Sequence, residues 1–162
     1  MKPTLKSYNV FTVFKKRVIL NCFYNACQRH HHHAVKNALL KDGWTITADP
    51  YFIKYEDAEL YADLAAEKPI AAERQGQKIV VEIKSFIGRS LMYDFHGALG
   101  QYIVYRNLIQ VTAPEYRLYL AIDDIVYQDF FKRKSIQVIT NENQVLLMVV
   151  EMAKEEILQW IN

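Results

Sequence analysis

The sequence predicts an α/β (α+β) domain in which a mixed central sheet is flanked by helices. The chain has 162 residues, about half of them apolar, which suffices for one domain with a packed core. Short alternating segments are mixed with a few segments of three- and four-residue periodicity. A hairpin with its turn at Gln75-Gly76 lies near the middle of the chain. Strands interspersed with a few helices in this way favour a mixed sheet.

Two longer helices and one short helix are predicted from apolar periodicity. Apolar residues recur at helical spacing over residues 30–40, and Asp42-Gly43 supplies a stop. A second helix begins after Ser90, a suitable N-cap, and runs to about Gln110. Its apolar stripe consists of Leu91, Phe95, Leu99, Tyr102 and Ile103, and we assign Phe95, Leu99 and Tyr102 of this stripe to the core. The short helix covers residues 123–131.

The remaining segments are predicted to be extended, because they are rich in apolar and β-branched residues and are bounded by turn residues. They are residues 44–47, 51–55, 60–66, 70–74, 78–85, 116–122, 135–140, 145–150 and 157–161.

Residues 1–29 differ in composition from the rest of the chain. Residues 1–33 hold six of the 20 basic residues and no acidic one, so the remainder carries a formal charge of −4. We therefore divide the chain into an atypical N-terminal extension, residues 1–29, and a single domain, residues 30–162. The extension is interpreted as disordered or translated from a start codon placed too far upstream. A basic arm for nucleic acid or acidic lipid is the alternative.

The composition favours a cytoplasmic protein. Cys22 and Cys27 are the only cysteines and both lie in the extension, so no disulfide framework is implied. Lys15, Lys16 and Arg17 interrupt the apolar stretch of residues 10–27, which leaves pieces too short for a membrane span or a signal peptide. No membrane association is expected.

The strand of residues 78–85 carries the most informative side chains. Because a strand alternates its faces, Val80, Glu82 and Lys84 point to one side of the sheet and the intervening apolar residues to the other. A carboxylate and an ammonium group near the end of a mostly buried strand are costly to desolvate unless they have a partner or a function. If this pair is considered alone, the simpler interpretation is that it lies at an edge of the sheet, where it is solvated or forms a salt bridge.

A metal site for phosphodiester hydrolysis is the chemical interpretation. Mg²⁺ or Mn²⁺ takes oxygen ligands, which Glu82 and an upstream Asp63 would supply. Lys84 would orient the nucleophile or stabilise the developing negative charge. Glu67 and Glu73 compete with Asp63, because a register shift of one residue exchanges the carboxylate that faces Glu82.

The second long helix places Gln101 and Tyr105 one turn apart on one face, where they can join this site. Asp63, Glu82-Ile-Lys84 and Gln101-x-x-x-Tyr105 resemble the PD-(D/E)XK nuclease superfamily in its RecB-like branch. This resemblance implies a restriction-endonuclease-like fold. It also assigns His32 as an upstream histidine that touches metal or phosphate, although a surface histidine within the run of residues 30–33 is the simpler interpretation.

Longer stretches of sequence resemble the XisH family from about residue 31 to the end of the chain. They are His32-x-Ala34-Val-Lys-Asn-Ala-Leu, Lys41-Asp-Gly-Trp44-Thr-Ile-Thr, Asp63-Leu-Ala-Ala-Glu-Lys, Ile70-Ala-Ala-Glu73, Val81-Glu-Ile-Lys-Ser-Phe86, Ala98-Leu-Gly-Gln101-Tyr and Gln159-Trp-Ile-Asn162.

The XisH resemblance implies a cyanobacterial protein similar to the fdxN-element excision controlling factors. Such proteins assist a site-specific recombinase in removing a DNA element and act beside a XisI-type protein partner. Three readings stay open: a metal-dependent DNA endonuclease, an accessory that binds DNA or protein without cutting, and the nuclease half of a toxin-antitoxin-like pair. A homodimer is expected if the two C-terminal strands lie at the edge of the sheet rather than at its centre.

Overall fold

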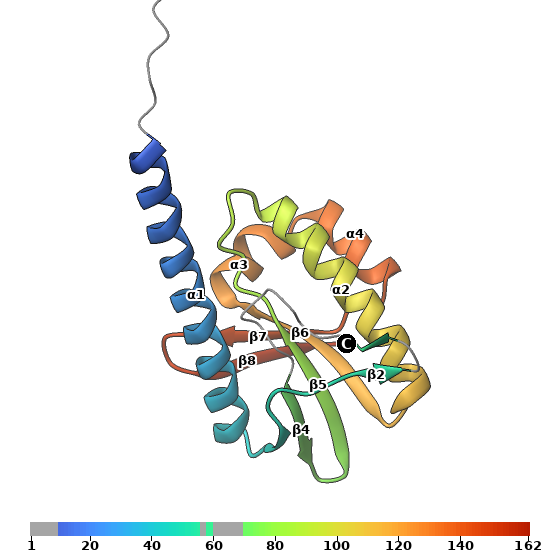
Figure 1. The fold of residues 1–162 in the computed structure, drawn as a ribbon. Coiled ribbons are helices and arrows are strands. Elements are labelled where there is room, and N and C mark those ends of the chain that lie inside the picture. The colour runs from blue at the N-terminus through green and yellow to red at the C-terminus, as the bar shows by residue number, and fades with distance from the viewer. Residues whose placement is uncertain (1–9, 56–57, 60–69) are drawn as a thin grey trace, which may run out of the picture.

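The computed structural model describes residues 10–55, 58–59 and 70–162 of the chain. One mixed sheet forms the middle of the molecule, with α1 packed on one face and α2 with α4 on the other (Figure 1). The predicted α+β class, with helices on both sides of a mixed sheet, is therefore confirmed.

The sheet has six strands in the order β1-β4-β5-β6-β7-β8. Pairing is parallel between β5 and β6 and between β6 and β7, and antiparallel at every other step. A separate two-stranded ribbon joins β2 to β3. The strands are β1 (Thr45–Ala48), β2 (Lys54–Tyr55), β3 (Ala58–Glu59), β4 (Ile70–Arg74), β5 (Gln77–Ile83), β6 (Tyr116–Asp123), β7 (Leu147–Glu151) and β8 (Glu156–Ile161).

Helices precede, connect and cover these strands. They are α1 (Val10–Lys41), α2 (Leu91–Thr112), the single turn α3 (Asp124–Val126), the π-helical turn η1 (Tyr127–Phe131) and α4 (Lys134–Glu142). The helix α2 is the crossover between the parallel strands β5 and β6, and α3, η1 and α4 together form the crossover between β6 and β7. The short helix predicted over residues 123–131 corresponds to α3 and η1.

The helix α1 ends at the predicted stop. Gly43 has a φ of 81°, and its N–H donates to the carbonyl of Leu40, while the Trp44 N–H donates to that of Leu39. A left-handed glycine is the common way to end a helix and satisfy its last carbonyls. The start was predicted too late, because α1 begins at Val10 rather than near His30.

The two faces of the sheet bury different clusters of side chains. The face under α1 buries Ile79, Val81 and Ile83 of β5. The opposite face, under α2, buries Val80 of the same strand together with Phe95 of α2. The alternation predicted for this strand is thus observed, and β5 is buried on both faces from Ile79 to Ile83, as is typical of strands in a parallel sheet.

One predicted strand is wrong. Residues 135–140 belong to α4, not to the sheet. Ile136 and Thr140, four residues apart, are the buried positions of this helix, and the Thr140 hydroxyl donates to the Ile136 carbonyl. The β-branched composition of the segment favours a strand, but burial of this single helical face against the α2 side of the core prevails. The strand predicted over residues 60–66 lies outside the described residues.

Candidate active site

The end of β5 places Glu82 and Lys84 together on the α2 side of the sheet. Glu82 is completely buried, and its Oε1 lies 3.0 Å from Nζ of Lys84, whose side chain keeps 13% of its exposure. The backbone of Lys84 continues the parallel ladder, because its N–H donates to the Ala121 carbonyl at 3.1 Å. The backbone that carries both side chains is therefore fixed by the hydrogen bonds of the sheet.

This position is the carboxyl end of the parallel strands β5, β6 and β7. The register pairs Glu82 with Leu120 and Ile83 with Ala121, so the end of β5 lies beside the end of β6. Ligands of open α/β sheets bind outside the carboxyl ends of such strands. The pair thus lies where this topology favours a binding site.

The helix α2 brings Tyr105 and Gln101 to the same place. Burial raises the pKa of the Tyr105 hydroxyl, and the negative charge of Glu82 raises it further, while a hydrogen bond with Gln101 and the charge of Lys84 lower it. These influences mean that the four side chains share one electrostatic environment. Tyr105 is consequently a neutral hydroxyl at physiological pH, able to donate a hydrogen bond.

The neighbouring Tyr102 belongs to the core, as predicted. Its hydroxyl donates to the carbonyl of Leu118 at 3.0 Å and accepts from the N–H of Leu146 at 2.9 Å. It therefore joins α2 to β6 and to the segment before β7, and it has no role in the chemistry of the candidate site.

The loop after Lys84 is fixed by aromatic packing and by one carboxylate. Phe86 has a φ of 47°, a left-handed conformation that is uncommon for a residue with a side chain, and its ring packs on Phe130 and Phe131 of η1. The carboxylate of Asp94 accepts the Gly88 N–H at 2.7 Å. The sequence predicted the helical turn of η1 but not its packing against Phe86, which depends on tertiary contacts.

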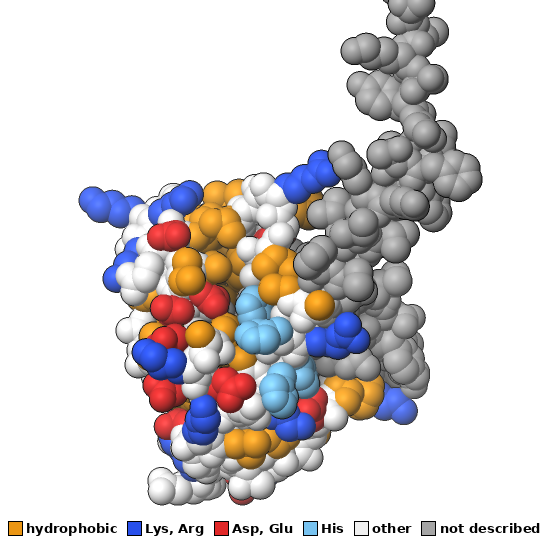
Figure 2. Space-filling model, turned by 90° about the vertical axis from the view of Figure 1, so that its left-hand side faces the viewer, with side chains coloured by type: hydrophobic (Ala, Val, Ile, Leu, Met, Phe, Trp, Pro, Cys, Tyr) orange, Lys and Arg blue, Asp and Glu red, His pale blue; other side chains and the backbone are white. Residues whose placement is uncertain are grey.

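His32 contacts a residue that the sequence analysis did not single out. Its Nε2 lies 2.9 Å from one carboxylate oxygen of Asp49, and the ammonium of Lys36 lies 2.6 Å from the other. Histidine side chains gather on one face of the molecule (Figure 2). The described contacts of His32 therefore attach α1 to the end of β1, and none of them joins it to Glu82 or Lys84.

The predicted second ligand, Asp63, lies outside the described residues, as does Glu67. The competing Glu73 is placed by the hairpin register, which pairs it with Lys78 at the other end of β5 from Glu82. Four residues of strand separate Lys78 from Glu82, a distance of about 13 Å. Glu73 is therefore too far away to share an ion with Glu82.

A divalent metal would find one suitable oxygen ligand in the described part of the site. Among the described residues, no group of three or more His, Cys, Asp or Glu side chains could hold a metal ion. Mg²⁺ often binds through only one or two carboxylates, with waters and substrate phosphate completing its shell. The buried Glu82 carboxylate fits that chemistry, and the ligand role of Asp63 stays a prediction.

A family model described as XisH protein matches residues 26–158 of this sequence. The chain belongs to the XisH family. The match begins close to the boundary predicted near residue 30 and includes Gln28 and His31 of α1, both of which are buried. The division of the chain at residue 29 stays a prediction.

Two solved structures of this family resemble the chain over most of its length. One is an XisH family protein from Nostoc punctiforme, with 43% identity and a TM-score of 0.76 over 82% of this chain and 99% of that one. The other is a fdxN element excision controlling factor protein from Anabaena variabilis, with 45% identity and a TM-score of 0.77 over 83% and 99%. No curated protein matches the sequence. Among the described helices of this XisH chain, none is long and apolar enough to cross a membrane.

Proposed function

We propose that this XisH chain is an excision controlling factor that acts on DNA through a metal-dependent endonuclease site of the PD-(D/E)XK type. The observation that carries the proposal is the Glu82–Lys84 pair at the carboxyl end of the parallel strands, with Tyr105 and Gln101 beside it. The relative from Anabaena variabilis is described as a controlling factor for excision of the fdxN element. A role in controlling the removal of a DNA element fits a site that acts on DNA.

Each side chain has a distinct role in this proposal. A bound Mg²⁺ or Mn²⁺ would supply a Lewis acid that offsets charge on the phosphate and lowers the pKa of a water. Glu82, with Asp63, would hold it. Lys84 orients the attacking water and stabilises negative charge on the phosphate oxygens, because its ammonium is fixed beside Glu82. The Tyr105 hydroxyl and the Gln101 amide position the phosphate by hydrogen bonds.

Nicking of supercoiled plasmid by the purified protein tests this proposal. We expect cleavage that requires Mg²⁺ or Mn²⁺ and that disappears in Glu82→Gln and in Lys84→Ala. The matched control is Lys134→Ala, since Lys134 is an exposed residue of α4. Cleavage that persists in both site variants would come from a contaminant. An intact plasmid, with metal binding also absent by calorimetry, would rule out the enzyme for the isolated protein.

A second candidate is an accessory factor that binds DNA or a protein without cutting. The complete burial of Glu82 favours it, because a carboxylate paired with Lys84 inside the protein can serve structure alone. DNA binding that is unchanged by metal and by Glu82→Gln, without cleavage, would support this accessory role over the enzyme.

A XisI-type protein partner and a homodimer are further proposals, and both concern the edge of the sheet. The strand β7 is internal, whereas β8 is an edge strand with an exposed Leu158. An edge strand offers unpaired backbone groups to another chain. Co-expression with a XisI-type protein followed by size-exclusion chromatography tests the first proposal, and the molar mass of this protein alone tests the second. Separate elution of the two proteins at micromolar concentration would count against a stable complex between them. The same result would count against a toxin-antitoxin-like pair.

A further inference from the structure

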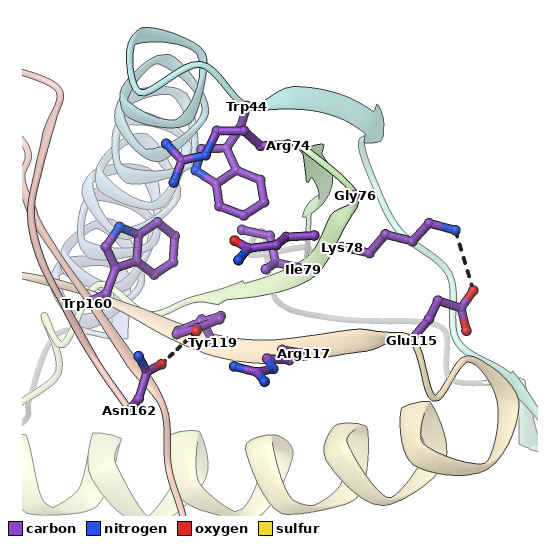
Figure 3. Close-up of a pocket in the computed structure, with 11 residues that line it drawn as sticks. Trp44, Arg74, Gly76, Lys78, Ile79, Glu115, Arg117, Tyr119, Trp160 and Asn162 are labelled. Atoms are coloured by element: carbon purple, nitrogen blue, oxygen red, sulfur yellow. Dashed lines mark hydrogen bonds and ion pairs between the residues drawn. The ribbon is translucent and has the colours of Figure 1, made fainter.

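A cavity of about 470 Å³ opens at the end of the sheet opposite to Glu82 and Lys84. It lies at the amino-terminal ends of β5 and β6, where Gln77 and Ile79 enter its lining from β5 and Arg117 and Tyr119 from β6 (Figure 3). Because Ile79 and Tyr119 belong to the cluster under α1, the cavity is on the other face of the sheet from the candidate active site. It is a separate feature of the molecule.

Three aromatic side chains form one wall of the cavity. The rings of Tyr119 and Trp160 are 4.8 Å apart and those of Trp44 and Trp160 are 5.8 Å apart, measured between centroids. The hydroxyl of Tyr119 donates to the Asn162 carboxamide at 2.7 Å, which joins the end of the chain to β6. The wall is thus built from packed, mutually supporting rings.

Three basic side chains line the cavity, and they differ in their partners. Arg74 lies 4.6 Å above the Trp44 ring and pairs with Asp42 at 2.8 Å, so its guanidinium plane is held in place. Lys78 points away from the cavity toward Glu115, 3.7 Å away (Figure 3). Arg117 is exposed, and no carboxylate pairs with it among the residues that the structure describes.

Two of the sequence stretches singled out for their family resemblance meet here and not at the candidate active site. Residues 41–47 supply Trp44, and residues 159–162 supply Trp160 and Asn162. The proposed endonuclease gives neither stretch a role. Their meeting around one cavity is the reason to consider a second binding site.

We propose that this cavity binds a nucleotide unit, with the base against the aromatic wall and Arg74 and the phosphate on Arg117. Aromatic rings and stacked guanidinium planes bind bases with little sequence preference, and arginine is the preferred partner of phosphate. The side-chain amides of Gln77 and Asn162 can hydrogen-bond to base edges. The volume lies within the roughly 300–1,000 Å³ range of small-ligand sites. A free mononucleotide and an unpaired nucleotide of a strand share this chemistry.

Tryptophan fluorescence measures binding at this cavity, because the two tryptophans of the chain both line it. We expect quenching that saturates during titration with a mononucleotide such as dAMP, or with a single-stranded oligonucleotide such as oligo(dT). Saturation by dAMP identifies a free nucleotide as a sufficient ligand, and saturation by oligo(dT) alone identifies an unpaired strand. The absence of saturable quenching by either dAMP or oligo(dT) overturns the proposal.

The variant Arg117→Gln separates this site from general electrostatic attraction. Loss of a charged hydrogen bond to phosphate should weaken binding about tenfold. The matched control Arg133→Gln removes an exposed arginine next to α4, on the other side of the sheet, and should leave binding unchanged. Equal affinity in wild type and Arg117→Gln, or equal weakening in both variants, contradicts the proposal. The titration requires no metal and no cleavage, so its failure is distinguishable from failure of the proposed endonuclease.

Discussion

The ammonium nitrogen of Lys84 lies 3.0 Å from a carboxylate oxygen of Glu82, and the Glu82 side chain is only 1% exposed. Removing one member of a buried ion pair leaves the other charge in a medium that solvates it poorly. The chemistry proposed for this pair and the stability of the domain are therefore linked.

Lys84→Met should lower the free energy of unfolding by roughly 3–5 kcal/mol, as for other buried pairs that lose one partner. The double variant Glu82→Gln/Lys84→Met should regain most of this loss, because no buried charge remains without its counter-charge. Urea unfolding of the four proteins in a double-mutant cycle measures the coupling. Additive effects of the two single changes would show that the pair does not interact.

Alkaline pH should destabilise the protein through its buried tyrosines. Burial raises the pKa of Tyr51, Tyr102 and Tyr105 above the ordinary value of 10.0. Between 10.0 and the raised values the unfolded state releases protons that the folded state keeps, so stability is full below about pH 10 and falls as the pH rises.

Tyr105→Phe isolates one part of that effect. When the pH is raised from neutral to above about 10, the free energy of unfolding of this variant should fall less than that of wild type, because one titrating group has been removed. Urea unfolding at a series of pH values, with tyrosinate absorbance recorded in parallel, tests this expectation. An identical pH profile for the variant would mean that Tyr105 ionises as freely in the folded state as in the unfolded chain.

Asp49 should stabilise the attachment of α1 to β1 only while it is ionised. Although burial acts to raise the pKa of Asp49, the neighbouring Lys36 and His32 outweigh it and lower the value below the usual 3.8. A lowered carboxyl pKa contributes stability above the unfolded value that is lost as the pH falls through the folded one.

Asp49→Asn should therefore cost no more than about 1 kcal/mol at neutral pH, because the pair is partly solvated. The difference from wild type should shrink as the pH falls below about 3.8, where the carboxyl gains its proton in the unfolded chain first, and should vanish once the pH is below the lowered folded pKa. Unfolding by urea at neutral and acid pH measures this. A difference that persists at low pH would assign the effect to packing rather than to charge.

Gly88→Ala should disturb the loop that follows Lys84. A Cβ atom at this position would lie 2.2 Å from Oδ1 of Asp94, so the Asp94 side chain must move and release the Gly88 N–H. We expect a loss of about 0.5–1.5 kcal/mol, the contribution of one hydrogen bond. In an Asp94→Ala background the same change should cost much less, and thermal unfolding of both pairs tests the difference. An equal cost in both backgrounds would show that the contact with Asp94 is not the cause.

Local signals in the sequence predicted much of the fold. Gly43 predicted the end of α1, Gln75-Gly76 predicted the hairpin turn, and the alternation of β5 placed Val80 and Glu82 on the side opposite Ile79. These predictions succeeded because turn conformation and strand alternation depend on neighbouring residues in the chain. Residues 135–140 failed because their β-branched composition indicates a strand, whereas burial against distant core residues favours α4.

The sequence by itself determined the residue types of the candidate site and the class of the fold, since carboxylate, ammonium and alternation are properties of the local chain. Only the tertiary structure decided which of these residues meet. It brought Gln101 and Tyr105 of α2 to Glu82 and Lys84. It also joined His32 to Asp49, and it placed Glu73 near the hairpin turn, at the other end of β5 from Glu82. The meeting of Trp44 with Trp160 was likewise decided by tertiary packing. The physical reason is that strand order and helix docking depend on burying the two faces of one sheet, and this balance involves the whole chain.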